Sequence, residues 1–325
     1  MKLASFAVPT PLGPRHRVGV RDDSGLVDVT TAYACVLDDR GEAAPIEVAE
    51  AIAPPEMLAF LRRGERAIEA AREAAAFAAD GGNSGVERGP DGARLVFDPG
   101  EVELLSPLPR PNSLRDCMAF EEHVENTLGE PPDAWYDLPV YYKGNPDSVV
   151  GPGATVEWPS YTDRLDYELE LAAVVGREGR DVPVAAANSY IAGYTVLDDF
   201  SARDTQLREM QGNLGPAKGK DFANALGPYL VTPDAFDPTE ATMTAAIDGE
   251  TVSEGTPGEM YHSFAEILAH VSASETLYPG DVIGSGTVGG GCGLETGRFL
   301  EPGETVALSI EGIGTLENRV IEPTE

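Results

Sequence analysis

The sequence predicts a strand-rich, mixed α/β protein. Its 325 residues are 42% hydrophobic and the apolar residues are spread along the whole chain, which is enough for a sizeable core and about two domains. Strand-like segments dominate the second part without regular alternation with helices, which disfavours a doubly wound sheet. A proline-rich junction at 106–111 separates the two parts. We therefore expect a smaller N-terminal domain over 1–105 and a larger domain over 106–325.

The first part begins with a predicted hairpin-rich β unit. Over residues 1–29 short apolar stretches alternate with Gly and Pro. Residues 56–79 follow two prolines, carry apolar side chains among alanines, and end at an Asp-Gly-Gly-Asn cluster, which is typical of one long helix. A loop over 80–94 and short strands at 95–97 and 101–105 complete this part.

The second part carries mainly strand signals. Asp248-Gly249 is a strong two-residue hairpin turn. Apolar runs and alternations predict strands at 165–175, 190–199, 228–231, 241–247, 281–283 and 306–310, and short helices are predicted at 114–128, 184–190 and 263–272.

The charge of the chain limits its partners. It has 55 acidic and 23 basic residues, a net charge of −32, and only four of the basic residues are lysines. Nucleic acid and anionic membranes are bound by clustered Lys and Arg, so neither is an expected partner. Molar salt shortens the Debye length to about 3 Å and screens the self-repulsion of such a chain. The acid excess therefore predicts a salt-rich cytoplasm and a halophilic source.

Cysteine usage and hydropathy predict a cytoplasmic protein. Cys35, Cys117 and Cys292 are odd in number and widely spaced, which indicates a reducing compartment. The apolar run near the N-terminus is too short for a signal peptide, and no run approaches the roughly 18 apolar residues of a membrane span.

A pair of carboxylates suggests a metal site. Glu168 and Glu170 point to the same face of a strand whose continuation is entirely apolar, so they need a compensating cation. A solvated strand face is the alternative. Without a nearby Cys or His cluster, the ion would be magnesium, manganese or calcium. The further ligands considered are Asp116 and either Asp198 or Asp199. His123 lies seven residues beyond Asp116, on the same face of the predicted helix 114–128.

Several short motifs together resemble the fumarylacetoacetate hydrolase superfamily over about residues 105 to 320. The resemblance implies a mixed β-sandwich or β-roll catalytic domain after a variable N-terminal domain, and a homodimer. The motifs are, in chain order, Asp116 with His123, Glu168-x-Glu170, Asp199-Phe200-Ser201-Ala202-Arg203-Asp204-x-Gln206, Lys220-Asp221-Phe222, Ser285-Gly286-Thr287 and Leu294-Glu295.

The resemblance also implies a role for each matching residue. The divalent ion would be Mg²⁺ first, or Mn²⁺ or Ca²⁺, and its ligands would be Asp116, Glu168, Glu170 and Asp199. His123 would be the general base, oriented by Glu295. Developing negative charge would be stabilised by Arg203, Gln206 and Lys220, with Lys218 as a substitute for Lys220. Tyr142 and Thr287 match substrate-contacting positions.

Departures from the family pattern concern substrate recognition. Met118 and Met210 stand where fumarylacetoacetases carry substrate-binding tyrosines, and Pro131-Pro132-Asp133 replaces an expected arginine. The metal and catalytic positions are kept, which favours a related 2-oxo or 1,3-dioxo acid as substrate.

The expected activity is metal-dependent hydrolysis of a carbon–carbon bond in an acylpyruvate-like or diketo acid. The alternative is 2-oxo acid chemistry on the same scaffold: a hydratase, a dehydratase of 2-oxo-3-deoxy sugar acids, an oxaloacetate decarboxylase or an isomerase. A non-catalytic acidic metal-binding protein is the alternative from another class. The cationic and amide groups of Arg203, Gln206 and Lys220 disfavour it, because they suit an anionic organic ligand.

Overall fold

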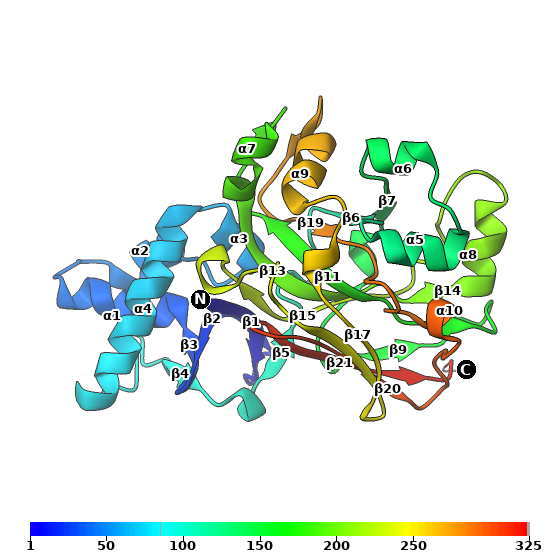
Figure 1. The fold of residues 1–325 in the computed structure, drawn as a ribbon. Helices are drawn as coiled ribbons and strands as arrows, with labels where there is room; N and C mark the ends of the chain where they lie inside the picture. The colour runs from blue at the N-terminus through cyan, green and yellow to red at the C-terminus, as the bar shows by residue number, and fades with distance from the viewer. Residues whose placement is uncertain (85, 324–325) are drawn as a thin grey trace.

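The computed structural model describes residues 1–84 and 86–323 and confirms a strand-rich, mixed α/β fold (Figure 1). One sheet of twelve strands runs through the molecule, and most neighbouring pairs in it are antiparallel. Its strands, in spatial order, are β4 (Val96–Phe97), β3 (Gly25–Asp28), β2 (Arg15–Asp22), β1 (Lys2–Val8), β15 (Asn224–Val231), β13 (Ile191–Asp198), β11 (Leu169–Val175), β19 (Asp281–Gly284), β6 (Ser113–Cys117) and β7 (Tyr141–Gly144), with β5 (Glu103–Leu105) beside β1 and β8 (Val149–Val150) beside β15.

A second sheet of five strands packs against the large one and encloses a core with it. The predicted turn at Asp248-Gly249 joins two of its strands, and both turn residues have positive φ (48° and 82°), as a type I′ turn requires. The order of this sheet is β17 (Glu250–Gly255), β16 (Met243–Ile247), β20 (Thr305–Ile310), β21 (Gly314–Ile321) and β9 (Thr155–Glu157); the short pairs are β10 (Leu165–Asp166) with β14 (Ser201–Ala202) and β12 (Gly179–Arg180) with β18 (Thr276–Leu277).

Strand β11 is buried on both faces. Leu171, Ala173 and Val175 belong to the core shared with the five-stranded sheet. Ala172 and Val174 belong to a second core, which the N-terminal helices cover. A strand between two cores needs apolar side chains at every position, which explains the unbroken apolar run in this part of the sequence.

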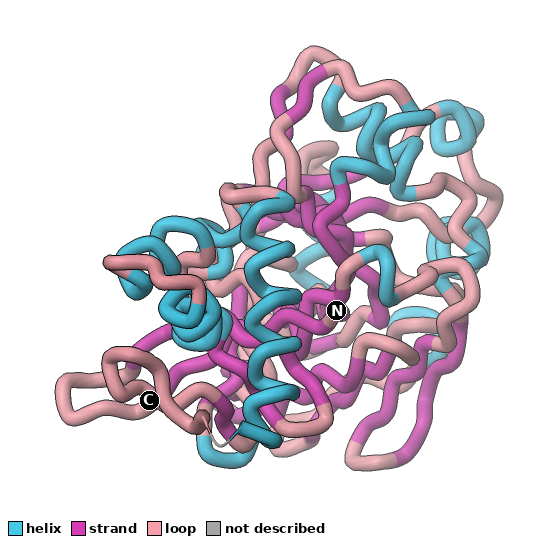
Figure 2. Tube along the Cα trace, turned by 90° about the vertical axis from the view of Figure 1, so that its left-hand side faces the viewer, coloured by secondary structure: helices cyan, strands magenta, loops and turns pink. Residues whose placement is uncertain are grey.

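The N-terminal helices gather at one side of the molecule in Figure 1 and lie in front of the strands in Figure 2. The prediction of one helix over 56–79 was wrong in two respects, because the helix is interrupted at 62–64 and its second part continues to Ser84, into the predicted loop 80–94. Gly64 has φ of +62°, which a continuous right-handed helix does not allow. The helices of this region are α1 (Val29–Asp39), α2 (Pro45–Ile52), α3 (Met57–Leu61) and α4 (Glu65–Ser84).

The predicted helix over 114–128 was wrong in its first half. Residues 113–117 form strand β6, which pairs with β19 and β7, and the helix α5 begins only at Glu121. Asp116 and His123 therefore lie on different elements and do not share a helix face. Sheet pairing on both sides of β6 outweighs the helical tendency of this segment.

The remaining helices lie in the second part of the chain. The predicted helix at 263–272 is confirmed as α9, and Ser263 and Glu266 form a capping box at its start. These helices are α5 (Glu121–Leu128), α6 (Asp133–Asp137), α7 (Val184–Ala187), α8 (Arg203–Met210), α9 (Phe264–Ser272) and α10 (Gly293–Thr296).

The division of the chain between residues 105 and 106 stays a prediction. The large sheet contains strands from both parts, because β1 pairs with β15 as well as with β2. Within residues 1–84 and 86–323, no helix has the length and apolar character needed to cross a membrane.

Candidate active site

Four buried carboxylates converge at one end of the central strands. Asp116 lies near the end of β6, Glu170 is on β11, Glu168 precedes β11, and Asp199 follows β13. These strands are adjacent or separated only by β19. One oxygen of each carboxylate lies within 4.8 Å of one oxygen of every other. We call these four residues the carboxylate cluster.

Gly284 makes room for this cluster. It ends β19 and lies opposite Asp116 on one side and Ala172 on the other. A Cβ atom at this position would lie 2.4 Å from Asp116 Oδ1 and 2.9 Å from Glu170 Oε2. Any side chain here would therefore collide with two carboxylates.

Burial and mutual repulsion shift the titration of most of the cluster. Burial and the charge of Asp199 raise the pKa of Asp116 to about 8. Burial raises the pKa of Asp199 to about 6, although Lys220 opposes the shift, and burial with the charge of Asp116 raises the pKa of Glu170 well above its usual range. The folded chain thus holds carboxylates that are costly to ionise without added positive charge.

Two buried cations compensate part of this charge. Lys220 Nζ donates to Glu168 Oε2 at 2.6 Å and to Asp199 Oδ2 at 2.5 Å. Arg203 Nη2 lies 2.8 Å from Glu168 Oε1. Burial would raise the pKa of Glu168, but Lys220 and Arg203 outweigh it and hold that pKa well below its usual range. Glu168 is therefore ionised while its neighbours resist ionisation.

The cluster fits a divalent cation. Asp116 Oδ1 and Asp199 Oδ1 are buried and have no hydrogen-bond partner in the described chain. A buried oxygen without a partner is expensive, and carboxylate oxygens are the ligands that Mg²⁺, Mn²⁺ and Ca²⁺ prefer. The residues present thus suit such an ion in number and in chemistry.

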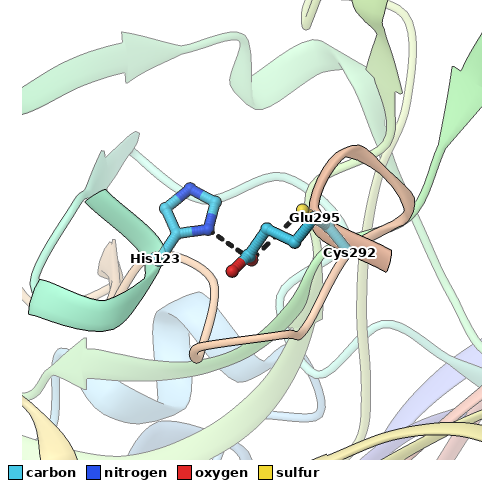
Figure 3. Close-up of side chains that lie close together, drawn as sticks. All are labelled: His123, Cys292 and Glu295. Carbon is cyan, nitrogen blue, oxygen red and sulfur yellow. Dashed lines mark hydrogen bonds and ion pairs between the residues drawn. The ribbon is translucent and has the colours of Figure 1, made fainter. Parts of the chain in front are cut away.

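His123 and Glu295 form a hydrogen-bonded pair (Figure 3). His123 is on α5 and Glu295 is on α10, and Nδ1 lies 2.7 Å from Glu295 Oε1. Glu295 also accepts from Asn126 Nδ2 at 2.8 Å and from the Gly290 backbone at 2.9 Å. Burial would raise the pKa of Glu295, but these bonds and His123 lower it. An ionised Glu295 keeps the proton on Nδ1 and leaves Nε2 as the acceptor.

Cys292 lies beside this pair. Its thiol donates to Glu295 Oε1 at 3.4 Å. Burial, against the opposing charge of Arg203, raises the pKa of Cys292 well above its usual range, so it remains a neutral thiol.

A cavity of about 320 Å³ lies between the carboxylate cluster and the His123–Glu295 pair. Lys218 does not line it, and the Lys220 ammonium lies at the cluster instead. Three predicted site residues, Glu170, Asp199 and Glu295, do not line the cavity themselves. Each is hydrogen-bonded to a residue that does, which is Thr287, Tyr142 and His123 respectively. The other predicted site residues all line the cavity: Asp116, Met118, His123, Tyr142, Glu168, Arg203, Gln206, Met210, Lys220 and Thr287.

The two predicted substrate-contacting hydroxyls bond to the cluster. Tyr142 Oη donates to Asp199 Oδ2 at 2.5 Å, and Thr287 Oγ1 lies 3.5 Å from Glu170 Oε1. The backbone of Gly286 donates to Glu170 Oε2 at 3.2 Å. The glycine-rich segment after β19 thus approaches a carboxylate of the protein itself.

Asp166 is a site residue that the sequence did not reveal. Its Oδ1 accepts from the Gly293 backbone at 2.7 Å, and its Oδ2 accepts from the Leu294 backbone at 2.9 Å and from Arg203 Nε at 2.7 Å. It therefore fixes the start of α10, which carries Glu295, and also fixes Arg203. Since α10 was not predicted, no sequence signal identified a partner for this acid.

Comparison with known proteins identifies relatives over the whole chain. The family model described as fumarylacetoacetate (FAA) hydrolase C-terminal matches residues 113–321. The mitochondrial oxaloacetate tautomerase of Homo sapiens is 30% identical over 326 residues, which cover 99% of this chain and 92% of that protein.

Solved structures of similar fold include two hydrolases. The fumarylacetoacetate hydrolase of Exiguobacterium antarcticum has a TM-score of 0.72 and 27% identity, and covers 99% of this chain and 100% of its own. The fumarylpyruvate hydrolase of Pseudomonas aeruginosa, solved in complex with Mn²⁺ and pyruvate, has a TM-score of 0.59 and 26% identity, and covers 66% of this chain and 91% of its own.

Proposed function

The chain belongs to the fumarylacetoacetate hydrolase family, and from this premise we propose that it is a metal-dependent hydrolase. Its substrate would be an acylpyruvate-like, 1,3-dioxo acid, in which it cuts a carbon–carbon bond. The observation that carries the proposal is the His123–Glu295 pair at 2.7 Å, which borders the same cavity as the carboxylate cluster.

The chemistry begins at His123 Nε2. This nitrogen takes a proton from water, whose oxygen bonds to the carbonyl carbon of the acyl group. The bond between that carbon and the neighbouring methylene then breaks, and its electron pair leaves as the enolate of pyruvate. The imidazolium returns its proton to the enolate carbon, and the products are pyruvate and a carboxylic acid. Glu295 stabilises the imidazolium between the two proton transfers.

Asp116, Glu168, Glu170 and Asp199 would hold the divalent ion, with Mg²⁺ as the first choice. When bound, the ion would act as a Lewis acid toward the dioxo group. The Mn²⁺ in the Pseudomonas hydrolase supports a divalent ion in this family.

Arg203 and Gln206 would stabilise the negative charge of the enolate. Arg203 Nη1 donates to Gln206 Oε1 at 3.0 Å, which leaves the amide NH₂ of Gln206 to donate to a ligand. Lys220 is bonded to two cluster carboxylates, so it would act mainly by compensating their charge.

A spectrophotometric screen tests the proposal. Acylpyruvates, fumarylacetoacetate, oxaloacetate and 2-oxo-3-deoxy sugar acids are presented in molar KCl with Mg²⁺ or Mn²⁺, and the products are identified. We expect pyruvate and a carboxylic acid from an acylpyruvate, with loss of turnover in EDTA and in His123→Ala. Turnover of only oxaloacetate or a sugar acid would contradict the hydrolase.

Oxaloacetate tautomerisation is a second candidate. It is favoured by the human relative, which is named for that reaction and matches 99% of this chain. Tautomerisation moves a proton between carbon and oxygen without cleaving a carbon–carbon bond. Faster decay of the enol absorbance of oxaloacetate, without release of a carboxylic acid from any acylpyruvate, would select it over hydrolysis.

The homodimer, the cytoplasmic location and the halophilic source stay predictions. Light scattering in high salt tests the first of these, and a monomeric mass would contradict it.

A further inference from the structure

The cavity has a polar inner end and an apolar outer end. At the inner end lie Asp116, Glu168 and the two buried cations. The remaining wall is formed largely by Met118, Leu128, Val140, Leu207, Met210 and Leu294.

Helix α8 sets this gradient along one of its faces. Arg203, Gln206, Leu207 and Met210 follow the spacing i, i+3, i+4 and i+7, so they share one face, and all four line the cavity. Arg203 contacts the cluster through Glu168, whereas Met210 is 46% exposed. With a rise of about 1.5 Å per residue, the two lie about 10 Å apart along the axis. The helix thus leads from a charged site to an apolar mouth.

Helix α5 repeats the arrangement on another wall. His123, near its start, pairs with Glu295, and Leu128, at its end, lines the same cavity and is 56% exposed. Met118 and Val140 continue this surface, because the Met118 backbone donates to Val140 O at 3.2 Å.

Among the described residues that line the cavity, no lysine or arginine lies at the apolar end. Among the cavity-lining residues the lysine and arginine side chains are Lys220 and Arg203, and both are bonded to carboxylates at the inner end. A carboxylate at the far end of a ligand would lie among apolar side chains, in a chain of net charge −32.

We infer that the substrate is an acylpyruvate whose acyl group ends in an uncharged, apolar chain, and that Leu207 and Met210 on α8 select it. The dioxo acid head lies at the inner end, and the alkyl tail lies along α8 toward the mouth. This inference rests on the proposed function, because it assigns the inner end to the dioxo acid.

The test compares two substrate series in molar KCl with Mg²⁺. One runs through acetylpyruvate, butanoylpyruvate and hexanoylpyruvate, and the other contains succinylpyruvate and adipoylpyruvate, which end in a carboxylate. We expect kcat/KM to rise about two- to fourfold per added methylene, the upper value corresponding to full burial. We expect it to fall at least about tenfold when the tail ends in a carboxylate. A flat series, or a preference for the carboxylate-ended substrates, overturns the inference.

Variants of α8 identify the selecting residues. Leu207→Ala and Met210→Ala should flatten the dependence on chain length, and Met210→Lys should improve adipoylpyruvate relative to hexanoylpyruvate. Val184→Ala is the matched control, because Val184 is an apolar residue that is 50% exposed and lies outside the cavity. If these variants change the mass measured by light scattering but leave the chain-length dependence unchanged, the apolar end of the cavity is a subunit contact, and the inference is overturned.

A binding measurement separates this inference from the proposed hydrolysis. Calorimetry with the same compounds on His123→Ala, in the presence of Mg²⁺, reads affinity without turnover. If the wild type cleaves no acylpyruvate, hydrolysis is refuted, and the dissociation constants still decide whether the cavity prefers an uncharged, apolar tail. Affinity that rises with chain length supports it, and affinity that is independent of chain length overturns it.

Discussion

Asp166 accepts a hydrogen bond from Arg203 outside the wall of the cavity, with Asp166 Oδ2 2.7 Å from Arg203 Nε. The same carboxylate accepts two backbone hydrogen bonds from the first turn of α10. One buried side chain thus fixes both the guanidinium beside Glu168 and the helix that carries Glu295, and it couples the carboxylate cluster to the proposed base.

Asp166→Asn should disturb both groups at once. The amide turns one acceptor into a donor that faces another N–H, which costs about 1–3 kcal/mol of unfolding free energy. A displaced α10 should lower kcat by about 10–100-fold. Turnover and urea denaturation measure the two effects, with the exposed Asp163→Asn as control. Wild-type values in both assays would refute this role.

Glu295→Gln should impair the proposed base without unfolding the protein. The neutral amide no longer stabilises an imidazolium at His123, so we expect kcat to fall about 10–100-fold while KM changes little. His123→Ala should lose about 10²–10⁴-fold. Steady-state kinetics measure both, and Glu125→Gln, on the exposed side of α5, is the control. Equal loss in the control would count against the pair.

Metal binding should depend on pH. Asp116, with a pKa of about 8, and Asp199, with a pKa of about 6, are raised above their ordinary values. Each binds its proton more tightly in the folded state, so its contribution to stability without metal is lost as pH rises through these values. Binding of Mg²⁺ requires the ionised forms. The melting temperature in EDTA should therefore fall as the pH rises from about 4 to 8, and the rise in melting temperature produced by Mg²⁺ should grow over the same range, as differential scanning fluorimetry can measure. A pH-independent rise would contradict the assignment.

Gly284→Ala should disturb the carboxylate cluster by placing a methyl group against it. The added Cβ would collide with Asp116 and Glu170, which we expect to cost about 1–3 kcal/mol and to weaken Mg²⁺ binding at least about tenfold. Calorimetric titration with Mg²⁺ measures the affinity. Gly100→Ala is the control, because its Cβ would meet only Asp98 Oδ1 at 3.4 Å. Unchanged affinity in Gly284→Ala would show that the cluster tolerates the methyl group.

The net charge of −32 predicts dependence on salt. Repulsion among the acidic side chains is screened at molar KCl and acts over about 30 Å at 0.01 M ionic strength. We expect a lower melting temperature, or dissociation of the expected dimer, when KCl is reduced from molar to millimolar. A melting temperature that does not move would remove the basis for a halophilic source.

The strands of the central sheet were largely predictable, and α1 was not. After Glu170, residues 171–175 of β11 form an unbroken apolar run, because both faces of the strand are buried there. Helix α1 is buried from Val29 to Leu37 and contains threonines and valines, so it shows no helical periodicity. The sequence predicts a helix from residue 114, whereas residues 114–117 belong to strand β6, because the strands that pair with β6, β19 and β7, both come later in the chain.

The candidate site was predicted as a set of positions rather than as a geometry. Motif order sufficed to select the four carboxylates, which the fold brings together from separate segments. It did not reveal that Lys220 bonds to Glu168 and Asp199, because a cation that lies 52 and 21 residues from its two partners carries no local pattern. The role of Asp166 was not predicted for the same reason, since its hydrogen-bond partners lie on α8 and α10.

The position of Lys220 also bears on how the site is assembled. Its ammonium holds Glu168 and Asp199 in place, with Asp116 Oδ1 and Asp199 Oδ1 left without hydrogen bonds. The folded chain therefore gathers like charges by means of a counter-ion of its own. A cation that binds there would meet carboxylates that are already oriented, because folding and not ion binding brings them together. A divalent ion bound there would therefore not have to fold its own site.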